Sequence, residues 1–144
     1  LGQNIKSICP NGFHNNLDNH CAHFVSHIMG FTFGFLCRYM TGKGKGGANI
    51  RVHEVFAKCQ SVGKWDAKPS SLKQCLAFVT AESNVNLSKK KMANVPKKHI
   101  GIFSGGEIYH YSNSQDKVVK QTPAAFAKHY SGSSITVFYG EFPK

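Results

Sequence analysis

The spacing of apolar residues divides the chain into an early part with helical periodicity and a late part with the short alternating runs of strands. Asn49 is a suitable N-cap for a helix that runs to about Cys59, and Thr122 followed by Pro123 predicts a helix to about Tyr130. Runs rich in β-branched and aromatic residues predict strands near residues 75–80, 99–103, 108–111, 117–120 and 135–139. The pattern therefore predicts an α+β fold, with helices early and an antiparallel sheet late, in a single domain over residues 1–144.

One early helix carries a candidate nucleophile. Asp18 and Asn19 are both good N-caps and Gly30 is a suitable C-cap, so a helix of about three turns fits between them. Cys21 falls in its first turn, where free N–H groups and the helix dipole stabilise a thiolate, which is the reactive form of cysteine. A small buried apolar residue is the alternative reading of the same cysteine.

The base that such a cysteine needs is found in a predicted hairpin. Gly105 and Gly106 occupy the turn position between two β-type runs. His99 opens the first strand and His110 lies near the end of the second, so antiparallel pairing brings the two imidazoles together at one end of the sheet. One ring can then accept the thiol proton of Cys21 while the other orients the first.

Three blocks of the sequence resemble the NlpC-type branch of papain-like cell-wall peptidases, which are relatives of the CHAP amidases. The blocks are Cys21-Ala22-His23-Phe24-Val25, His99-Ile100-Gly101-Ile102-Phe103 and His110-Tyr111. The resemblance implies a papain-like fold in which N-terminal helices, including the nucleophile helix, pack on a C-terminal antiparallel sheet. It also implies that Cys21 is the nucleophile, His99 the general base and His110 the orienting residue.

The substrate implied by the resemblance is an amide bond in the peptide stem of bacterial peptidoglycan. Small basic members without a wall-anchoring module resemble the amidase toxins that bacteria deliver into competitors. Asn113 is the alternative to His110 as third catalytic member, and the backbone N–H of Cys21, with Asn19 beside it, is the candidate oxyanion site. Stem peptides carry free carboxylates, so the candidate substrate-binding residues are His23, Arg38, Arg51 and Asn113.

The first block permits two other interpretations. It also resembles the Asn-Cys-Glu-His-Phe-Val block of lecithin:retinol acyltransferase-like proteins, in which the histidine strand precedes the cysteine; here Cys21 comes first, which favours the peptidase. The alternatives are thus an acyltransferase or thioesterase of that type, or a non-catalytic basic binding module. The block departs from the peptidase family at His20-Cys21-Ala22-His23, where Asp-Cys-Ser-Gly is usual, and no upstream tyrosine precedes it.

Neither a metal nor another cofactor is expected. His23 and His27 have a spacing that zinc accepts, but the sequence supplies no well-placed third ligand. His53 and His129 have no partner in the pattern and are expected on the surface. The five cysteines are an odd number, so at least one thiol is free or bridged to another chain; we expect free thiols.

The net charge of +11 predicts attraction to anionic polymers. Among the 18 basic residues only Arg38 and Arg51 are arginines, so nucleic acid is not the expected ligand. No apolar run is long enough for a membrane span, no signal peptide begins the chain, and residues 82–98 read as a solvated excursion. We expect a monomer, secreted or delivered to the bacterial periplasm or cell wall, with peptidoglycan as partner and an inhibitor (immunity) protein as a second one.

Overall fold

A computed structural model describes residues 52–93, 97–112, 114–115, 117–130 and 134–142. The helices of this part are α4 (Val52–Lys58) and α5 (Pro123–Phe126), with 3₁₀ turns η1 (Trp65–Ala67) and η2 (Glu82–Asn84). Its strands are β1 (Val62–Lys64), β2 (Gln74–Ala81), β3 (Val85–Asn86), β4 (Lys91–Met92), β5 (Lys98–Ser104), β6 (Glu107–Ser112), β7 (Lys117–Gln121) and β8 (Ile135–Gly140). Within the described residues the expected α+β class is therefore confirmed, whereas the predicted helix that carries Cys21 lies outside them.

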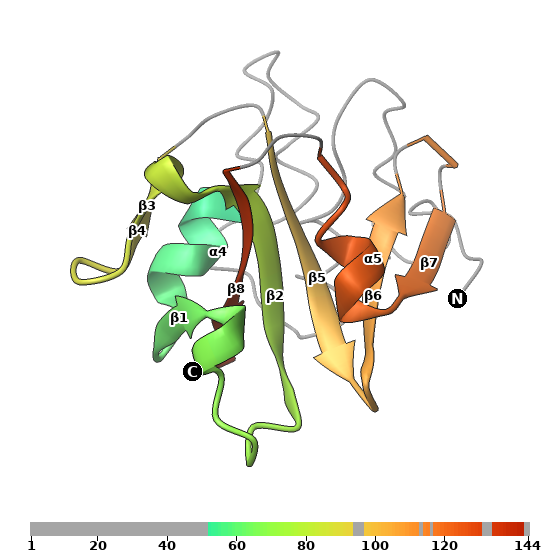
Figure 1. Cartoon of the computed structure of the whole chain (residues 1–144), viewed down its shortest axis with the longest axis horizontal. Coiled ribbons are helices and arrows are strands. Elements are labelled where there is room, and N and C mark those ends of the chain that lie inside the picture. The colour runs from blue at the N-terminus through green and yellow to red at the C-terminus, as the bar shows by residue number, and fades with distance from the viewer. Residues whose placement is uncertain (1–51, 94–96, 113, 116, 131–133, 143–144) are drawn as a thin grey trace, which may run out of the picture.

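The main sheet has the strand order β1-β8-β2-β5-β6-β7, and every pairing in it is antiparallel. Figure 1 shows α5 in front of β5 and β6, while α4 lies behind β2 and β8. The sheet therefore has two covered faces, here called the α4 face and the α5 face. In the described part of the chain no helix is long and apolar enough to cross a bilayer.

The α4 face holds the larger apolar cluster. Helix α4 directs Val52, Val55 and Phe56 into it because residues three and four apart share one side of a helix. The Phe56 ring meets Phe78 of β2 edge-on, with ring centroids 5.0 Å apart, and Phe138 of β8 at 6.5 Å. Such edge-to-face pairs stabilise by about 0.5–1.5 kcal/mol beyond the burial of their area. This contact fixes α4 against the middle of the sheet.

The α5 face is built around Phe126, which is fully buried together with Ala77, Val79 and Ile108. Thr122 begins α5 as an N-cap, its hydroxyl accepting the N–H of Ala125. The helix is shorter than predicted. After Phe126 the backbone tightens, because the N–H groups of Lys128 and His129 donate to carbonyls three residues back. This tight turn, rather than a continued α-helix, determines where His129 lies.

The β5–β6 hairpin has the predicted turn. Gly105 and Gly106 form it with φ angles of +63° and +84°, which only glycine adopts without strain. On β5, Gly101 leaves the room that lets β5 and β6 side chains approach closely. A Cβ at this position would lie 2.6 Å from Cγ2 of Ile108 and 3.1 Å from Cβ of His110.

Residues 82–93 are mostly exposed or half-buried, as a solvated excursion would be, but they also pack on the α4 face. The β3–β4 hairpin packs Met92 into the α4-face cluster, with Val85 and Leu87 against its rim. Lys90 lies in the turn between β3 and β4 and has a φ of 53°. Its ammonium group donates a hydrogen bond to the carbonyl oxygen of Cys59, which directly follows α4. A cation at this end of a helix is favourable because the dipole is negative there. The lysine-rich run therefore contains one structural lysine.

We expect Gly101→Ala to destabilise the domain by about 1–3 kcal/mol, because the new methyl group would overlap Ile108 and the carbonyl of Tyr109, which lies on the backbone and yields little. Urea denaturation followed by circular dichroism measures the loss. Ser104→Ala, at the end of the same strand, is the matched control and should change stability by no more than about 0.5 kcal/mol. Equal stability of the two variants would contradict the packing argument.

Candidate active site

Three side chains form a chain of hydrogen bonds across neighbouring strands on the α5 face. Nε2 of His99 on β5 lies 2.8 Å from Nδ1 of His110 on β6. Nε2 of the same His110 lies 2.8 Å from Oε1 of Gln121, the last residue of β7. The predicted proximity of the two imidazoles is confirmed, and the hydrogen-bond chain continues one residue further than the sequence suggested.

Strand register explains why these residues meet. His110 pairs with Val119 across β6 and β7, and Ile108 pairs with Gln121, so His110 and Gln121 are diagonal neighbours on one face. His99 and Gly101 likewise share the α5 face of β5. Because Gly101 has no side chain, His99 can reach His110 without an intervening group. The two-residue turn fixes this register.

Aromatic rings enclose the histidine pair. The ring of His129 stacks on that of His99, with centroids 4.1 Å apart and planes within 4° of parallel. Phe126 approaches His99 at 5.8 Å and His110 at 5.3 Å. As a result His99 is only 1% exposed and His110 3% exposed. We refer to His99, His110, His129 and Gln121 as the imidazole cluster.

One ring nitrogen of the cluster has no hydrogen-bond partner in the described part of the chain. Nδ1 of His99 is buried and makes no hydrogen bond to any of the described residues. Burying a polar atom without a partner is unfavourable by about 1–3 kcal/mol. Such atoms in native structures call for an explanation, and catalytic groups that await a substrate or a second residue are one of the usual ones.

The environment keeps the cluster uncharged. Burial lowers the pKa of His99 well below its ordinary value, and the neighbouring His129 and His110 lower it further. Burial also lowers the pKa of His110, although its hydrogen bond to Gln121 opposes that shift, and burial lowers the pKa of His129. Neutral imidazoles at neutral pH are what a general base requires.

Most of the sequence-predicted site residues lie outside the described residues. This applies to Asn19, Cys21, His23, Arg38, Arg51 and Asn113, so the predicted contact between Cys21 and His99 stays a prediction, as does the choice between His110 and Asn113. His129 is exposed, as expected, but it has a partner that the sequence pattern did not indicate, because its ring stacks on that of His99. Gln121 was missed too, because the predicted strand ended at Lys120 and its register with β6 could not be derived from the pattern.

The described cysteines are not candidates for the nucleophile. Cys59 and Cys75 are free thiols, as expected, and both are fully buried. Burial raises the pKa of Cys59 to about 12 and that of Cys75 to about 11. Both therefore stay protonated and unreactive. Among the described residues no group of three histidine, cysteine or acidic side chains is arranged to hold a metal.

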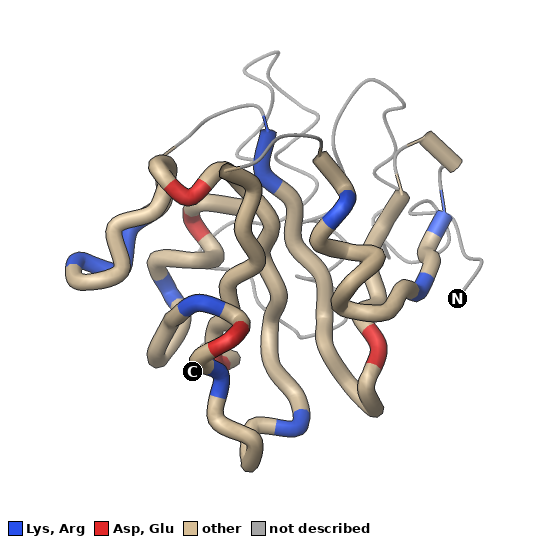
Figure 2. Tube along the Cα trace, viewed as in Figure 1, with Lys and Arg blue, Asp and Glu red and all other residues tan. Residues whose placement is uncertain are grey.

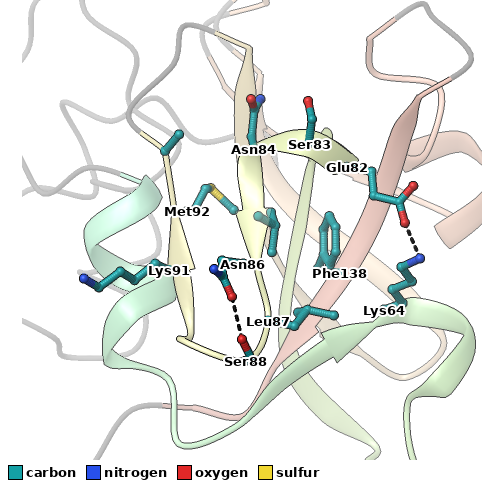
Figure 3. Close-up of a pocket in the computed structure, with 12 residues that line it drawn as sticks. Lys64, Glu82, Ser83, Asn84, Asn86, Leu87, Ser88, Lys91, Met92 and Phe138 are labelled. Atoms are coloured by element: carbon teal, nitrogen blue, oxygen red, sulfur yellow. Dashed lines mark hydrogen bonds and ion pairs between the residues drawn. The ribbon is translucent and has the colours of Figure 1, made fainter.

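A groove of about 660 Å³ lies on the other side of the sheet. Figure 3 shows Leu87, Met92 and Phe138 lining it, with Lys64 and Glu82 ion-paired at one margin. These apolar residues belong to the α4-face cluster or pack against it, and the described residues that line the groove include no histidine. This groove and the imidazole cluster are thus different places, on opposite faces of the sheet.

Comparisons of the chain with protein-family models, with curated protein sequences and with solved structures gave no match.

Stability should fall as the pH is lowered from 7.5 to 5. The unfolded chain binds a proton at each histidine near pH 6.5, whereas the folded pKa of His99 and that of His110 are lowered. Between the folded and unfolded pKa the unfolded state holds more protons, so the free energy of unfolding decreases with decreasing pH. Urea titrations at several pH values measure this slope. His99→Phe keeps a buried ring without an ionisable group and should show a smaller slope; an unchanged slope would assign the effect to other residues.

Proposed function

We propose that this protein is a cysteine amidase or endopeptidase that hydrolyses amide bonds in the peptide stem of bacterial peptidoglycan. In this proposal Cys21 is the nucleophile, His99 the general base and His110 the residue that orients it. The proposal includes a papain-like, NlpC-type fold, in which the nucleophile helix packs on the antiparallel sheet. The resemblance of the three sequence blocks supplies the substrate class.

The observation that carries the proposal is the unequal treatment of the two ring nitrogens of His99. Nε2 is held by His110, which Gln121 holds in turn, while Nδ1 is buried without a partner among the described residues. A general base needs this arrangement, with one nitrogen fixed and the other free to accept a proton. The large majority of buried side-chain polar atoms in native structures are hydrogen-bonded, so an unpaired Nδ1 beside a fixed Nε2 favours this role for His99.

The proposed reaction is acyl transfer to water. Nδ1 of His99 takes the thiol proton of Cys21, and the thiolate attacks the amide carbonyl carbon. The C–N bond breaks, and His99 returns the proton to the departing amine. His99 then takes a proton from water as the hydroxide oxygen attacks the thioester, which releases the carboxylate product and regenerates the thiol.

The surroundings suit a substrate with free carboxylates. Figure 2 shows basic residues at the start of β5, beside α5 and along β7, the elements that carry the cluster. In sequence, Lys98 directly precedes His99 and Lys128 directly precedes His129. An excess of positive charge around a neutral site attracts an anionic stem peptide without charging the base itself.

Incubation with purified peptidoglycan, read out by mass spectrometry of the released fragments, tests the proposal. Wild-type protein should release stem-peptide fragments. Cys21→Ala and His99→Ala should each lower the rate by about 10³-fold or more, because a nucleophile and its base act as one unit. Adding a chelator should leave the rate unchanged.

The matched control is Cys75→Ala, which removes a thiol that is buried and protonated. It should keep the wild-type rate. Folded Cys21→Ala protein with undiminished release would exclude the thiol mechanism, and loss of release with chelator would indicate a metal hydrolase instead.

Alkylation by iodoacetamide gives a test that needs no substrate. At neutral pH, Cys21 should react faster than Cys59 and Cys75, because burial raises the pKa of these two thiols to about 12 and about 11. In His99→Gln, the reaction of Cys21 should slow by roughly tenfold, since the base that favours the thiolate is lost. Peptide mapping by mass spectrometry measures each site. Equal reactivity of Cys21 in both proteins would contradict the pairing with His99.

A further inference from the structure

The hydrogen-bond chain has a direction, and Gln121 determines it. Oε1 of Gln121 is a carbonyl oxygen, which can only accept a hydrogen bond. Because this atom faces Nε2 of His110 at 2.8 Å, the hydrogen of His110 must be on Nε2. With the Gln121 amide in this orientation, no other neutral tautomer of His110 gives this contact a hydrogen.

The same reasoning carries over to the next ring. A neutral imidazole has one N–H, so Nδ1 of His110 is left as an acceptor. This atom lies 2.8 Å from Nε2 of His99, which must therefore be the donor. The lone pair of His99 is then on Nδ1, which is the buried nitrogen without a partner among the described residues. Gln121 thus determines the tautomer of His110, and His110 determines the tautomer of His99.

We infer that Gln121 is a positioning residue which, acting through His110, holds His99 in the tautomer whose Nδ1 is the basic nitrogen. Its role in catalysis rests on the proposed function of His99 as general base. Gln121 touches neither substrate nor nucleophile in this scheme. It acts by removing the alternative tautomer, in which Nδ1 would carry the hydrogen and could not accept a proton.

The position of Gln121 in the fold suits this role. It is the last residue of β7 and directly precedes Thr122, whose hydroxyl caps α5. The side chain is therefore attached where backbone pairing with Ile108 ends and the helix begins. Phe126 of the same helix packs on the His110 ring and shields one side of the part-buried contact with Gln121. Both neutral rings are consistent with the lowered pKa of His99 and of His110.

Gln121→Met and Gln121→Glu separate the tautomer role from simple packing. Methionine has a similar length and volume but offers no oxygen, so it removes the constraint on His110. Glutamate keeps an acceptor oxygen at the same position and should therefore preserve the tautomer of His99 and the catalytic rate. Gln74→Met is the matched control, since Gln74 lies on β2, which is separated from β7 by β5 and β6, and its exposed side chain donates to Ser104. Thermal unfolding establishes that each variant is folded.

Two measurements are made on each folded protein. Long-range ¹H–¹⁵N spectra of the imidazoles distinguish a nitrogen that carries hydrogen from one with a lone pair. Wild-type protein and Gln121→Glu should show the lone pair of His99 on Nδ1, whereas Gln121→Met should show a mixture of tautomers. On soluble peptidoglycan fragments, Gln121→Met should lower kcat by at least about tenfold with KM within about twofold, because a catalytic histidine in the wrong tautomer loses up to ~10⁴-fold in rate.

The outcomes are distinct. Hydrogen on Nδ1 of His99 in the wild-type protein overturns the inference, and so does a fall in kcat in Gln121→Met with tautomers unchanged. A tautomer shift in Gln121→Met without a change in kcat also overturns the positioning role. If the spectra behave as expected but wild-type protein releases nothing from peptidoglycan, the proposed function fails while the assignment of the tautomer stands.

Discussion

The two-residue turn between β5 and β6 is the constraint on which the site depends. A pair of glycines with positive φ sets the register of the hairpin, and a slip by one residue would turn His110 to the opposite face of the sheet. With this register, the imidazole of His110 has His99 on one side and Gln121 on the other. The hydrogen-bond chain is therefore a product of backbone pairing rather than of loop conformation.

Burial stabilises one part of the His99–His110–Gln121 hydrogen-bond chain and is unfavourable for another. Enclosure by Phe126 and His129 keeps both central imidazoles neutral and strengthens the hydrogen bond between them, because the local dielectric is low. The same enclosure buries Nδ1 of His99, which has no hydrogen-bond partner among the described residues. Unpaired buried polar atoms are unfavourable, and the rest of the structure must stabilise the fold enough to offset them. In enzymes, such an atom can be the basic nitrogen that accepts a proton during the reaction.

Sequence reasoning worked best where the physics is local. The glycine turn, the buried strand near Cys75 and the cap at Thr122 follow from backbone preferences that a few residues determine, and all three are present. It failed where the outcome depends on tertiary packing. The position of His129 follows from a tightened turn after Phe126, whereas the helix start at Thr122 and Pro123 predicted a helix that continues to about Tyr130.

The candidate site was predicted only in part, because only some of its residues are positioned by local backbone preferences. Strand pairing is enough to bring His99 and His110 together, so the hairpin pattern found them. Gln121 comes from a third strand, whose register depends on the β6–β7 connection, and no local signal fixes that connection. The strand β1 was likewise missed, because Val62, Gly63 and Lys64 have no strand pattern and form one only by pairing with β8.

The two faces of the main sheet are separated by a single layer of backbone. The imidazole cluster lies on one of them, while Phe56, Phe78 and Phe138 pack on the other. Neighbouring residues along β2 and β5 point to opposite sides, so side-chain volume can be exchanged on the α4 side without entering the histidine environment. Protein engineering of this domain therefore has a natural starting point in Ile100 and Leu76, where thermostability and chemistry can be adjusted independently.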